Sequence, residues 1–196
     1  MGVSSAPPGY GDTVTQVVLL EGGSDVAAIE AVVRVLGRDD HGVRYVDMQG
    51  VTNVRAHLER LRFQEPETEV LGMCDASGSG FVMRALEEGG AWLQDASDLP
   101  TYGFVVCEAD LEDELLRALG PDRAIAAIEG IGLAAKLTHF RQEAAWQDRP
   151  VMEQLHRFAG AGSGRKEAVD AALAAALTPE DVPEPLRMLA ERIGTG

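Results

Sequence analysis

With 196 residues, of which 45% are hydrophobic and 25% charged, the chain has the size and composition of one globular domain with a hydrophobic core. It lacks both the roughly 18-residue apolar run of a membrane span and a secretory signal, so with two cysteines we expect a cytoplasmic protein without disulfides. The 32 acidic residues outnumber 17 Lys and Arg, and the net charge of −15 excludes a general attraction to nucleic acid or to anionic membranes.

The basic residues are unevenly spread along the chain. The segment from Lys136 to Lys166 holds six Lys and Arg against three acids, whereas the rest is strongly acidic. This asymmetry suits a protein that gathers cations at one place and contacts a polyanion at another. A chance fluctuation across a solvated surface is the alternative, and composition alone does not separate the two.

Apolar runs alternate with helical periodicity over the first two-thirds of the chain. Residues 1–12 are expected to be a disordered lead-in. Buried strands are predicted at 14–20, 43–48, 69–74 and 101–109, and helices at 25–37, 50–62, 80–90 and 110–120. This alternation indicates βαβ units and an α/β fold, with a mostly parallel four-stranded sheet flanked by helices.

From Pro121 onward no convincing strand appears. Short helices are expected at 121–130, 151–159, 164–177 and 184–193. The chain is therefore predicted to consist of an α/β domain over residues 13–120 and a helical extension, 121–196, that packs on it.

Acidic residues follow three of the predicted strands. Glu21 ends the first strand, Asp25 opens the next helix and Asp75 ends the third strand. Four more acids crowd the helix start after the fourth strand: Asp110, Glu112, Asp113 and Glu114. Because the carboxyl ends of parallel strands share one edge of a sheet, we expect these side chains to lie close together.

Two interpretations of these acids stay open. Acids at helix starts cap the backbone, which explains Asp25, Asp110 and Asp113, and an Asp at a strand end often serves only a turn. Glu21, however, ends a run that should be buried, where its charge would require a neutralising cation. Carboxylate oxygens in this number suit Mg²⁺, Mn²⁺ or Ca²⁺, and the charge balance favours a metal site.

Other motifs do not match a known site. The GGS after the first strand lacks the dinucleotide pattern, and GAGSGRK follows no strand and has Glu after its Lys, which excludes a Walker A loop. The four histidines lack zinc-ligand spacing and are expected on solvated or helical faces. No Ser has a His partner nearby, and a receiver domain would need a Lys after a fifth strand.

Five stretches, in this order, resemble a Toprim domain: VVLLEGGSDVAAIEA, the GVTN turn, LGMCDASGSGF, GFVVCEADLEDELLRALG and QLHRFAGAGSGRKEA. More closely, they resemble the Toprim part of OLD-family (overcoming lysogenization defect) nucleases and their short stand-alone relatives labelled Toprim nucleotidyl transferase/hydrolase. The resemblance covers roughly residues 15–190. It implies a Toprim-like, Rossmann-like fold.

The resemblance also assigns metal ligands for one or two ions, Mg²⁺ or Mn²⁺. These ligands would be Glu21, Asp25, Asp75, Asp110 and Glu112. In this assignment Glu21 has an additional acid/base role, and Lys166 stabilises charge on the phosphate being cleaved. The chain departs from the Toprim Asp-x-Asp pair, because Ser77 stands where the second acid is expected.

The function implied is metal-dependent phosphodiester hydrolysis of DNA by a stand-alone Toprim endonuclease. Arg157, Arg165 and Lys166 would contact the DNA phosphate backbone. Full-length OLD proteins carry an ATPase domain, so a separate ATPase subunit is an expected partner, and the oligomeric state stays open. The alternatives are a catalytically degenerate module that binds a metal or a partner, and a nucleotidyl transferase.

Overall fold

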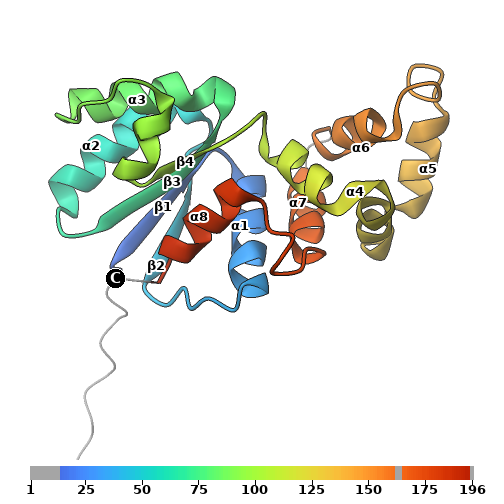
Figure 1. Cartoon of the computed structure of the whole chain (residues 1–196), viewed down its shortest axis with the longest axis horizontal. Helices are drawn as coiled ribbons and strands as arrows, with labels where there is room; N and C mark the ends of the chain where they lie inside the picture. The colour runs from blue at the N-terminus through green and yellow to red at the C-terminus, as the bar shows by residue number, and fades with distance from the viewer. Residues whose placement is uncertain (1–13, 162–164, 195–196) are drawn as a thin grey trace, which may run out of the picture.

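The computed structural model describes residues 14–161 and 165–194. Four strands form one sheet in the order β2-β1-β3-β4, and all three neighbouring pairs are parallel (Figure 1). The strands are β1 (Gln16–Leu20), β2 (Val43–Asp47), β3 (Glu69–Asp75) and β4 (Phe104–Cys107). The predicted four-stranded parallel sheet is confirmed.

Helices cover both faces of the sheet. One face packs against α1 (Gly23–Val35), α7 (Lys166–Ala175) and α8 (Glu184–Arg192), and the other against α2 (Val54–Gln64), α3 (Ser79–Glu88) and the 3-10 turn η3 (Ala96–Tyr102). Two further 3-10 turns, η1 (Val51–Asn53) and η2 (Ala76–Gly78), lead into α2 and α3. The remaining helices, α4 (Leu111–Gly130), α5 (Ala134–Gln142) and α6 (Val151–Ala159), extend beyond the sheet (Figure 1).

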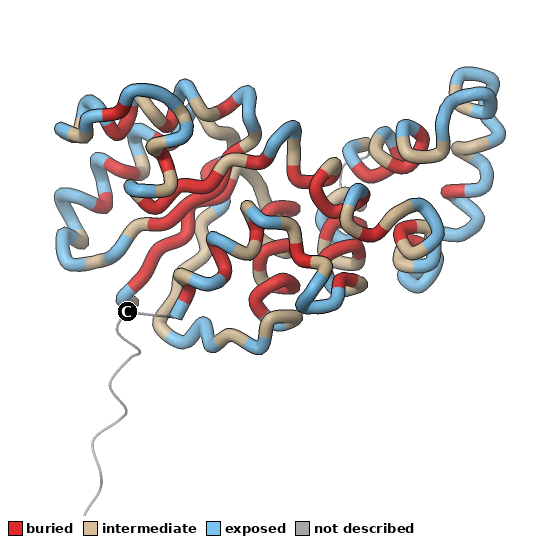
Figure 2. The backbone as a smooth tube through the Cα atoms, in the orientation of Figure 1, coloured by how far each residue is buried: buried red, intermediate tan, exposed pale blue. Residues whose placement is uncertain are grey.

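The core is divided by the sheet because successive strand residues point to opposite faces. Every residue of β1 is buried (Figure 2). Val17 and Leu19 pack against α2 and α3, whereas Val18 and Leu20 pack in the larger cluster with α1, α4, α7 and α8. Cys74 and Cys107 are free and buried. Among the described residues no helix has both the length and the apolar character needed to cross a bilayer.

The structure shortens one predicted strand and adds one helix. The strand expected at 101–109 covers only 104–107, because the side chain of Asp95 accepts a hydrogen bond from the Ser97 amide and starts η3. Gly103 then ends η3 in the left-handed backbone conformation, with φ 88°, directly before β4 begins. Helix α5 was not predicted, since its only buried residue is Leu137 and it therefore lacks an apolar stripe.

Near Pro121 the structure agrees with the predicted break. Gly120 has non-helical φ and ψ of 70° and 168°, so α4 is two helical segments joined by a kink. The described part of the expected helix at 164–177 begins at Lys166, and residues 1–12 lie outside the described residues. We propose that the helices after Pro121 form an extension of the α/β domain, since α7 and α8 complete one face of the sheet.

Candidate metal centre

The first two acids meet where β1 and β3 end. Glu21 follows the last residue of β1, and its Oε1 accepts a hydrogen bond of 3.0 Å from the backbone amide of Asp75, the last residue of β3. The two strands are parallel neighbours, which brings their carboxyl ends to the same edge. The expected convergence at this edge is therefore present for Glu21 and Asp75.

Asp25 lies in the first turn of α1 and is 8% exposed. Its Oδ2 accepts a 2.8 Å hydrogen bond from the Gly22 amide, so it has the capping role that a helix start predicts. Burial raises the pKa of Asp25 to about 6, and Glu112 and Glu21 add to the rise, although Lys166 and the Gly22 amide oppose it. A cap alone would not require such burial.

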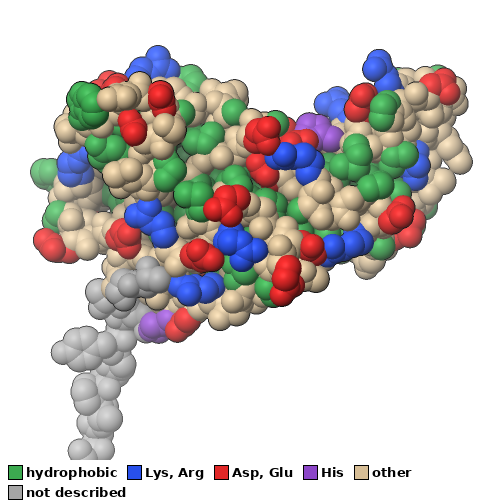
Figure 3. All heavy atoms as spheres, viewed as in Figure 1, with side chains coloured by type: hydrophobic (Ala, Val, Ile, Leu, Met, Phe, Trp, Pro, Cys, Tyr) green, Lys and Arg blue, Asp and Glu red, His purple; other side chains and the backbone are tan. Residues whose placement is uncertain are grey.

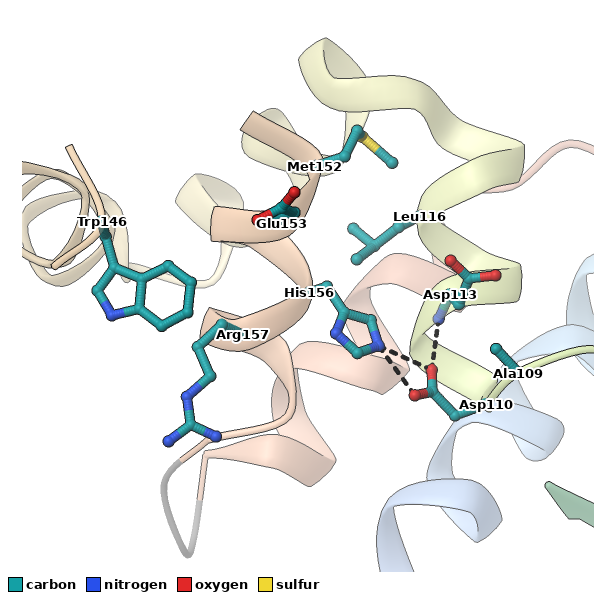
Figure 4. A pocket seen from close by; sticks show the side chains of 9 residues that line it. All are labelled: Ala109, Asp110, Asp113, Leu116, Trp146, Met152, Glu153, His156 and Arg157. Carbon is teal, nitrogen blue, oxygen red and sulfur yellow. Dashed lines mark hydrogen bonds and ion pairs between the residues drawn. The ribbon is translucent and has the colours of Figure 1, made fainter. Parts of the chain in front are cut away.

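The start of α4 contributes two further acids. Asp110 is the N-cap, accepts a hydrogen bond from the Asp113 amide at 2.8 Å, and lies 2.9 Å from His156 Nε2 of α6 (Figure 4). Glu112 is 5% exposed, and its Oε1 lies 2.8 Å from Lys166 Nζ, at the start of α7. Helices from the last third of the chain thus bring a His and a Lys to the acids.

The pKa of Asp75 is raised by the charges of the other four predicted metal ligands. Burial raises its pKa to about 7, and Glu21, Asp25, Asp110 and Glu112 raise it further, in that order. Five carboxylates from β1, α1, β3 and α4 therefore share one electrostatic environment, although most belong to different segments of the sequence.

A cavity of about 280 Å³ opens at this edge. Its walls are formed by side chains from β3, α4, α6 and α7 and by one glycine: Asp75, Asp110, Glu112, His156, Arg157, Lys166 and Gly160. Glu21 and Asp25 do not line it, and neither does Arg165, which stacks on Phe158 with its guanidinium 4.2 Å from the ring centre. Figure 3 shows a hollow between the α3 end of the molecule and the α5–α6 end, with acidic, basic and His side chains at its floor.

The donor chemistry fits a hard divalent cation, but the acids do not form a complete coordination shell. Within residues 14–161 and 165–194 no three His, Cys, Asp or Glu side chains are arranged to hold one ion. Glu21 is bonded to the Asp75 amide and Glu112 to Lys166. Carboxylate oxygens suit Mg²⁺ or Mn²⁺, and a cation would relieve the repulsion that raises the pKa of Asp75. The ammonium of Lys166 supplies positive charge next to Glu112 and lowers the pKa of Asp25.

Two neighbours of the centre were not singled out from the sequence. Asp170 is fully buried in α7, and neither carboxylate oxygen has a hydrogen-bond partner. Burial raises its pKa to about 8, and the charge of Glu112 contributes. Its spacing of four residues from Lys166 places both on one helical face, which is the signal available in the sequence. His156 reaches Asp110 only through the packing of α6 on α4, for which no local pattern exists.

Ser77 does not replace the missing carboxylate in this arrangement. It is exposed in η2 and does not line the cavity. Gly78, by contrast, is buried next to Glu21. A Cβ on Gly78 would lie 2.9 Å from Glu21 Oε1 and 3.0 Å from the Val51 side chain.

Replacing Gly78 by Ala is therefore expected to displace the Glu21 carboxylate from the Asp75 amide. We expect a loss of about 1 kcal/mol in the free energy of unfolding, typical of a mild steric overlap, and weaker binding of Mn²⁺. Thermal melting with and without Mn²⁺ measures both effects. Gly80→Ala is the matched control, because its Cβ would meet open space in α3. Equal melting curves for the two variants would contradict the crowding of Glu21.

As the pH is lowered below about 7, the affinity for Mn²⁺ is expected to decrease, by about tenfold per pH unit for each proton that competes with the metal. Protons first occupy Asp75, with its pKa of about 7, and then Asp25, with its pKa of about 6. Calorimetric titrations in two buffers of different ionisation enthalpy would measure the protons released on binding. An affinity that is constant across this range would exclude both side chains as ligands.

The chain was compared with known proteins by sequence and by structure. The sequence matches no family profile and no curated protein. Among solved structures, the C-terminal region of the Burkholderia pseudomallei OLD protein is similar, with a TM-score of 0.66 and 19% identity over 92% of this chain and 96% of that one. Two structures of the C-terminal region of the Xanthomonas campestris pv. campestris OLD protein, phased with platinum and with mercury, share 22% identity over 91% of this chain, with TM-scores of 0.64 and 0.65. They cover 91% and 94% of those chains. The chain therefore has the Toprim-like fold of the C-terminal region of OLD proteins.

Proposed function

We propose that this chain is a divalent-metal-dependent endonuclease that hydrolyses phosphodiester bonds in DNA. The observation that carries the proposal is the position of Lys166, whose Nζ enters the cavity of Asp75, Asp110 and Glu112 from a distant part of the sequence. Lys166 pairs with the buried Glu112, and it also lines a cavity at the open edge of the sheet. An ammonium in that position can bind an anionic phosphate beside a metal ion.

The residues have separate tasks in this reaction. Glu21, Asp25, Asp75, Asp110 and Glu112 would hold one or two ions of Mg²⁺ or Mn²⁺, which when bound supply Lewis acidity and lower the pKa of a water. Lys166 Nζ donates to a phosphate oxygen, where negative charge increases during cleavage. The acid/base role would fall to the second carboxylate oxygen of Glu21, because Oε1 is already bonded to the Asp75 amide, and Glu21 adjoins the cavity only through Asp75. His156 holds Asp110 in place through its Nε2.

DNA contacts are proposed for the basic side chains beyond Lys166. Arg157 is exposed on α6 and lines the same cavity, and Arg165 lines a neighbouring cavity of about 650 Å³ together with Lys136 and His139. Arg157 lines both cavities, so the basic side chains form a continuous path from the metal centre that supports binding of the phosphate backbone. A cytoplasmic location and a separate ATPase subunit belong to the same proposal.

A catalytically degenerate module is the second candidate. The exposed Ser77 and the pairing of Glu112 with Lys166 favour it, because both reduce the carboxylates that are available to a metal. In that case metal or partner binding would occur without cleavage.

Plasmid nicking separates the two candidates. Wild-type protein should nick supercoiled DNA in Mn²⁺ and not in EDTA, and Glu21→Gln should remove nicking. Glu87→Gln is the matched control, since Glu87 is exposed on α3 away from the centre. Nicking that persists in Glu21→Gln would contradict the assignment, whereas a metal-dependent rise in melting temperature without any nicking would support the degenerate module.

A further inference from the structure

A groove crosses the exposed side of α6, from Trp146 to Asp110 (Figure 4). This α6 groove has a volume of about 480 Å³, and Leu116 and Met152 contribute apolar surface to it. It adjoins the metal centre directly, because Asp110, His156 and Arg157 line both the groove and the smaller cavity. A ligand in the groove would therefore reach the reacting phosphate.

One basic side chain of the α6 groove, Arg157, has no acidic partner among the described residues, although the lining as a whole contains more acidic than basic side chains. Each acid of the groove lies next to a basic side chain. Asp110 contacts His156, Asp113 pairs with Arg117 at 2.8 Å, and Glu153 lies 3.8 Å from Arg149. Arg157 has no ion pair or hydrogen bond with any described residue. An anionic group such as a phosphate is the ligand that this unpaired guanidinium favours.

Trp146 is held rigidly at the other end of the groove. Its indole stacks on Phe140 with ring centres 5.3 Å apart and planes at 27°, and Phe140 packs edge-on against the buried Phe158. The loop that carries Trp146 is fixed by Gln154, which is 4% exposed and donates hydrogen bonds to the carbonyls of Trp146 and Arg149. An aromatic ring that is fixed in advance loses little entropy when a flat ligand stacks on it.

We propose that the α6 groove binds an unpaired base of the DNA strand that is cleaved, with the base stacked on Trp146 and its phosphate bound by Arg157. The inference rests on the proposed function and names its substrate class, which is single-stranded or locally unpaired DNA. Bases of an intact duplex are stacked on their neighbours and present no free face, whereas unpaired bases stack readily on aromatic side chains. The groove is large enough for a nucleoside together with its phosphate.

Trp146 fluorescence tests this arrangement. In the full chain carrying Trp92→Phe, Trp146 is the only tryptophan. Titration in Ca²⁺ with a single strand of about ten nucleotides, within the usual site size, is expected to quench its emission. A duplex of the same sequence with both ends closed by non-nucleotide linkers, and an abasic strand of the same length, should bind without quenching. Equal quenching by the closed duplex, or binding of the single strand without quenching, would overturn the proposal.

Two variant pairs assign the contacts. Trp146→Ala is expected to weaken binding of the single strand by about tenfold and to leave binding of the abasic strand unchanged. Trp92, which is 72% exposed, is the control: in Trp146→Phe its emission should not respond to DNA. Arg157→Ala should reduce the salt dependence of binding by about one phosphate contact, whereas Arg55→Ala on α2 should not. An unchanged affinity in Trp146→Ala would contradict stacking.

Failure of this inference is distinguishable from failure of the proposed function. If Trp146 emission is quenched by the single strand but the protein never nicks DNA, the base-binding groove is retained and DNA hydrolysis is rejected. Nicking of the closed duplex and the single strand at equal rates, without any change in Trp146 emission, would retain hydrolysis and reject the base-binding groove.

Discussion

Replacing Lys166 by Met is expected to lower the free energy of unfolding by about 2 kcal/mol and to abolish cleavage. Lys166 Nζ is the cation beside Glu112, at 2.8 Å, and it lowers the pKa of both Asp25 and Asp170. Its removal leaves buried carboxylates without a compensating charge. The loss stays below the 3–5 kcal/mol of a fully buried pair because 39% of the Lys166 side chain is exposed.

The acids around Lys166 determine how the destabilisation by Lys166→Met depends on pH. Burial by itself would lower the pKa of Lys166, but the hydrogen bond and charge of Glu112 and the charges of Asp25 and Asp170 outweigh it and raise the pKa. The ion pair is therefore intact at neutral pH, and the destabilisation of Lys166→Met should shrink as the acids become protonated.

Denaturant unfolding at about pH 5 and pH 8 measures the stability difference, and nicking assays measure activity. Lys136→Met is the matched control for the stability measurement, because Lys136 is exposed on α5 and forms no ion pair within the described part of the chain. Equal losses for the two variants at pH 8 would contradict the role of Lys166 as the neutralising cation.

Replacing Asp170 by Asn is expected to stabilise the protein at about pH 8 by about 3 kcal/mol. Burial and the charge of Glu112 raise the pKa of Asp170 from 3.8 to about 8. A raised folded-state pKa means that the bound proton favours folding completely below about pH 3.8, and that this contribution is lost as the pH rises to about 8. The Asn amide carries no charge and removes that loss, although its own lack of hydrogen-bond partners limits the gain.

The measurement is the free energy of unfolding in EDTA between about pH 5 and pH 8. Wild type should lose stability relative to Asp170→Asn across this range, and the two curves should converge toward low pH. Asp148→Asn changes an exposed position, and its free energy of unfolding should depend on pH in the same way as that of the wild type. A gain from Asp170→Asn that does not depend on pH would contradict the titration of this carboxyl group.

The sequence predicted the sheet because its information is local. Val-rich runs, a helical period and the acids at strand ends are each readable within a dozen residues, and the parallel topology then brings Glu21 and Asp75 together. Helix α5 escaped prediction because it buries a single side chain and packs through Phe140 and the loop at Trp146 instead.

The candidate site was predictable only in part for a related reason. Glu21 and Asp75 follow from strand ends, whereas Glu112 and Lys166 follow from a resemblance between motifs. His156 and Asp170 depend on how α6 and α7 pack on α4 and α1, which no short pattern specifies. The pairing of Glu112 with Lys166 rather than with its neighbouring acids also depends on this packing.

The packing of α7 on α1 has a consequence for the order in which the centre is assembled. The acids are synthesised by residue 112, whereas the lysine that compensates them arrives only with α7. In a nascent chain that ends before α7 the strands can form, but Asp25 and Glu112 lack both the helix that packs over α1 and α4 and its lysine. The sheet edge is therefore expected to stay open until the last third of the chain has been made. A truncated product would lack the lysine that balances these charges, so this edge of the sheet is expected to reach its final form only late in synthesis.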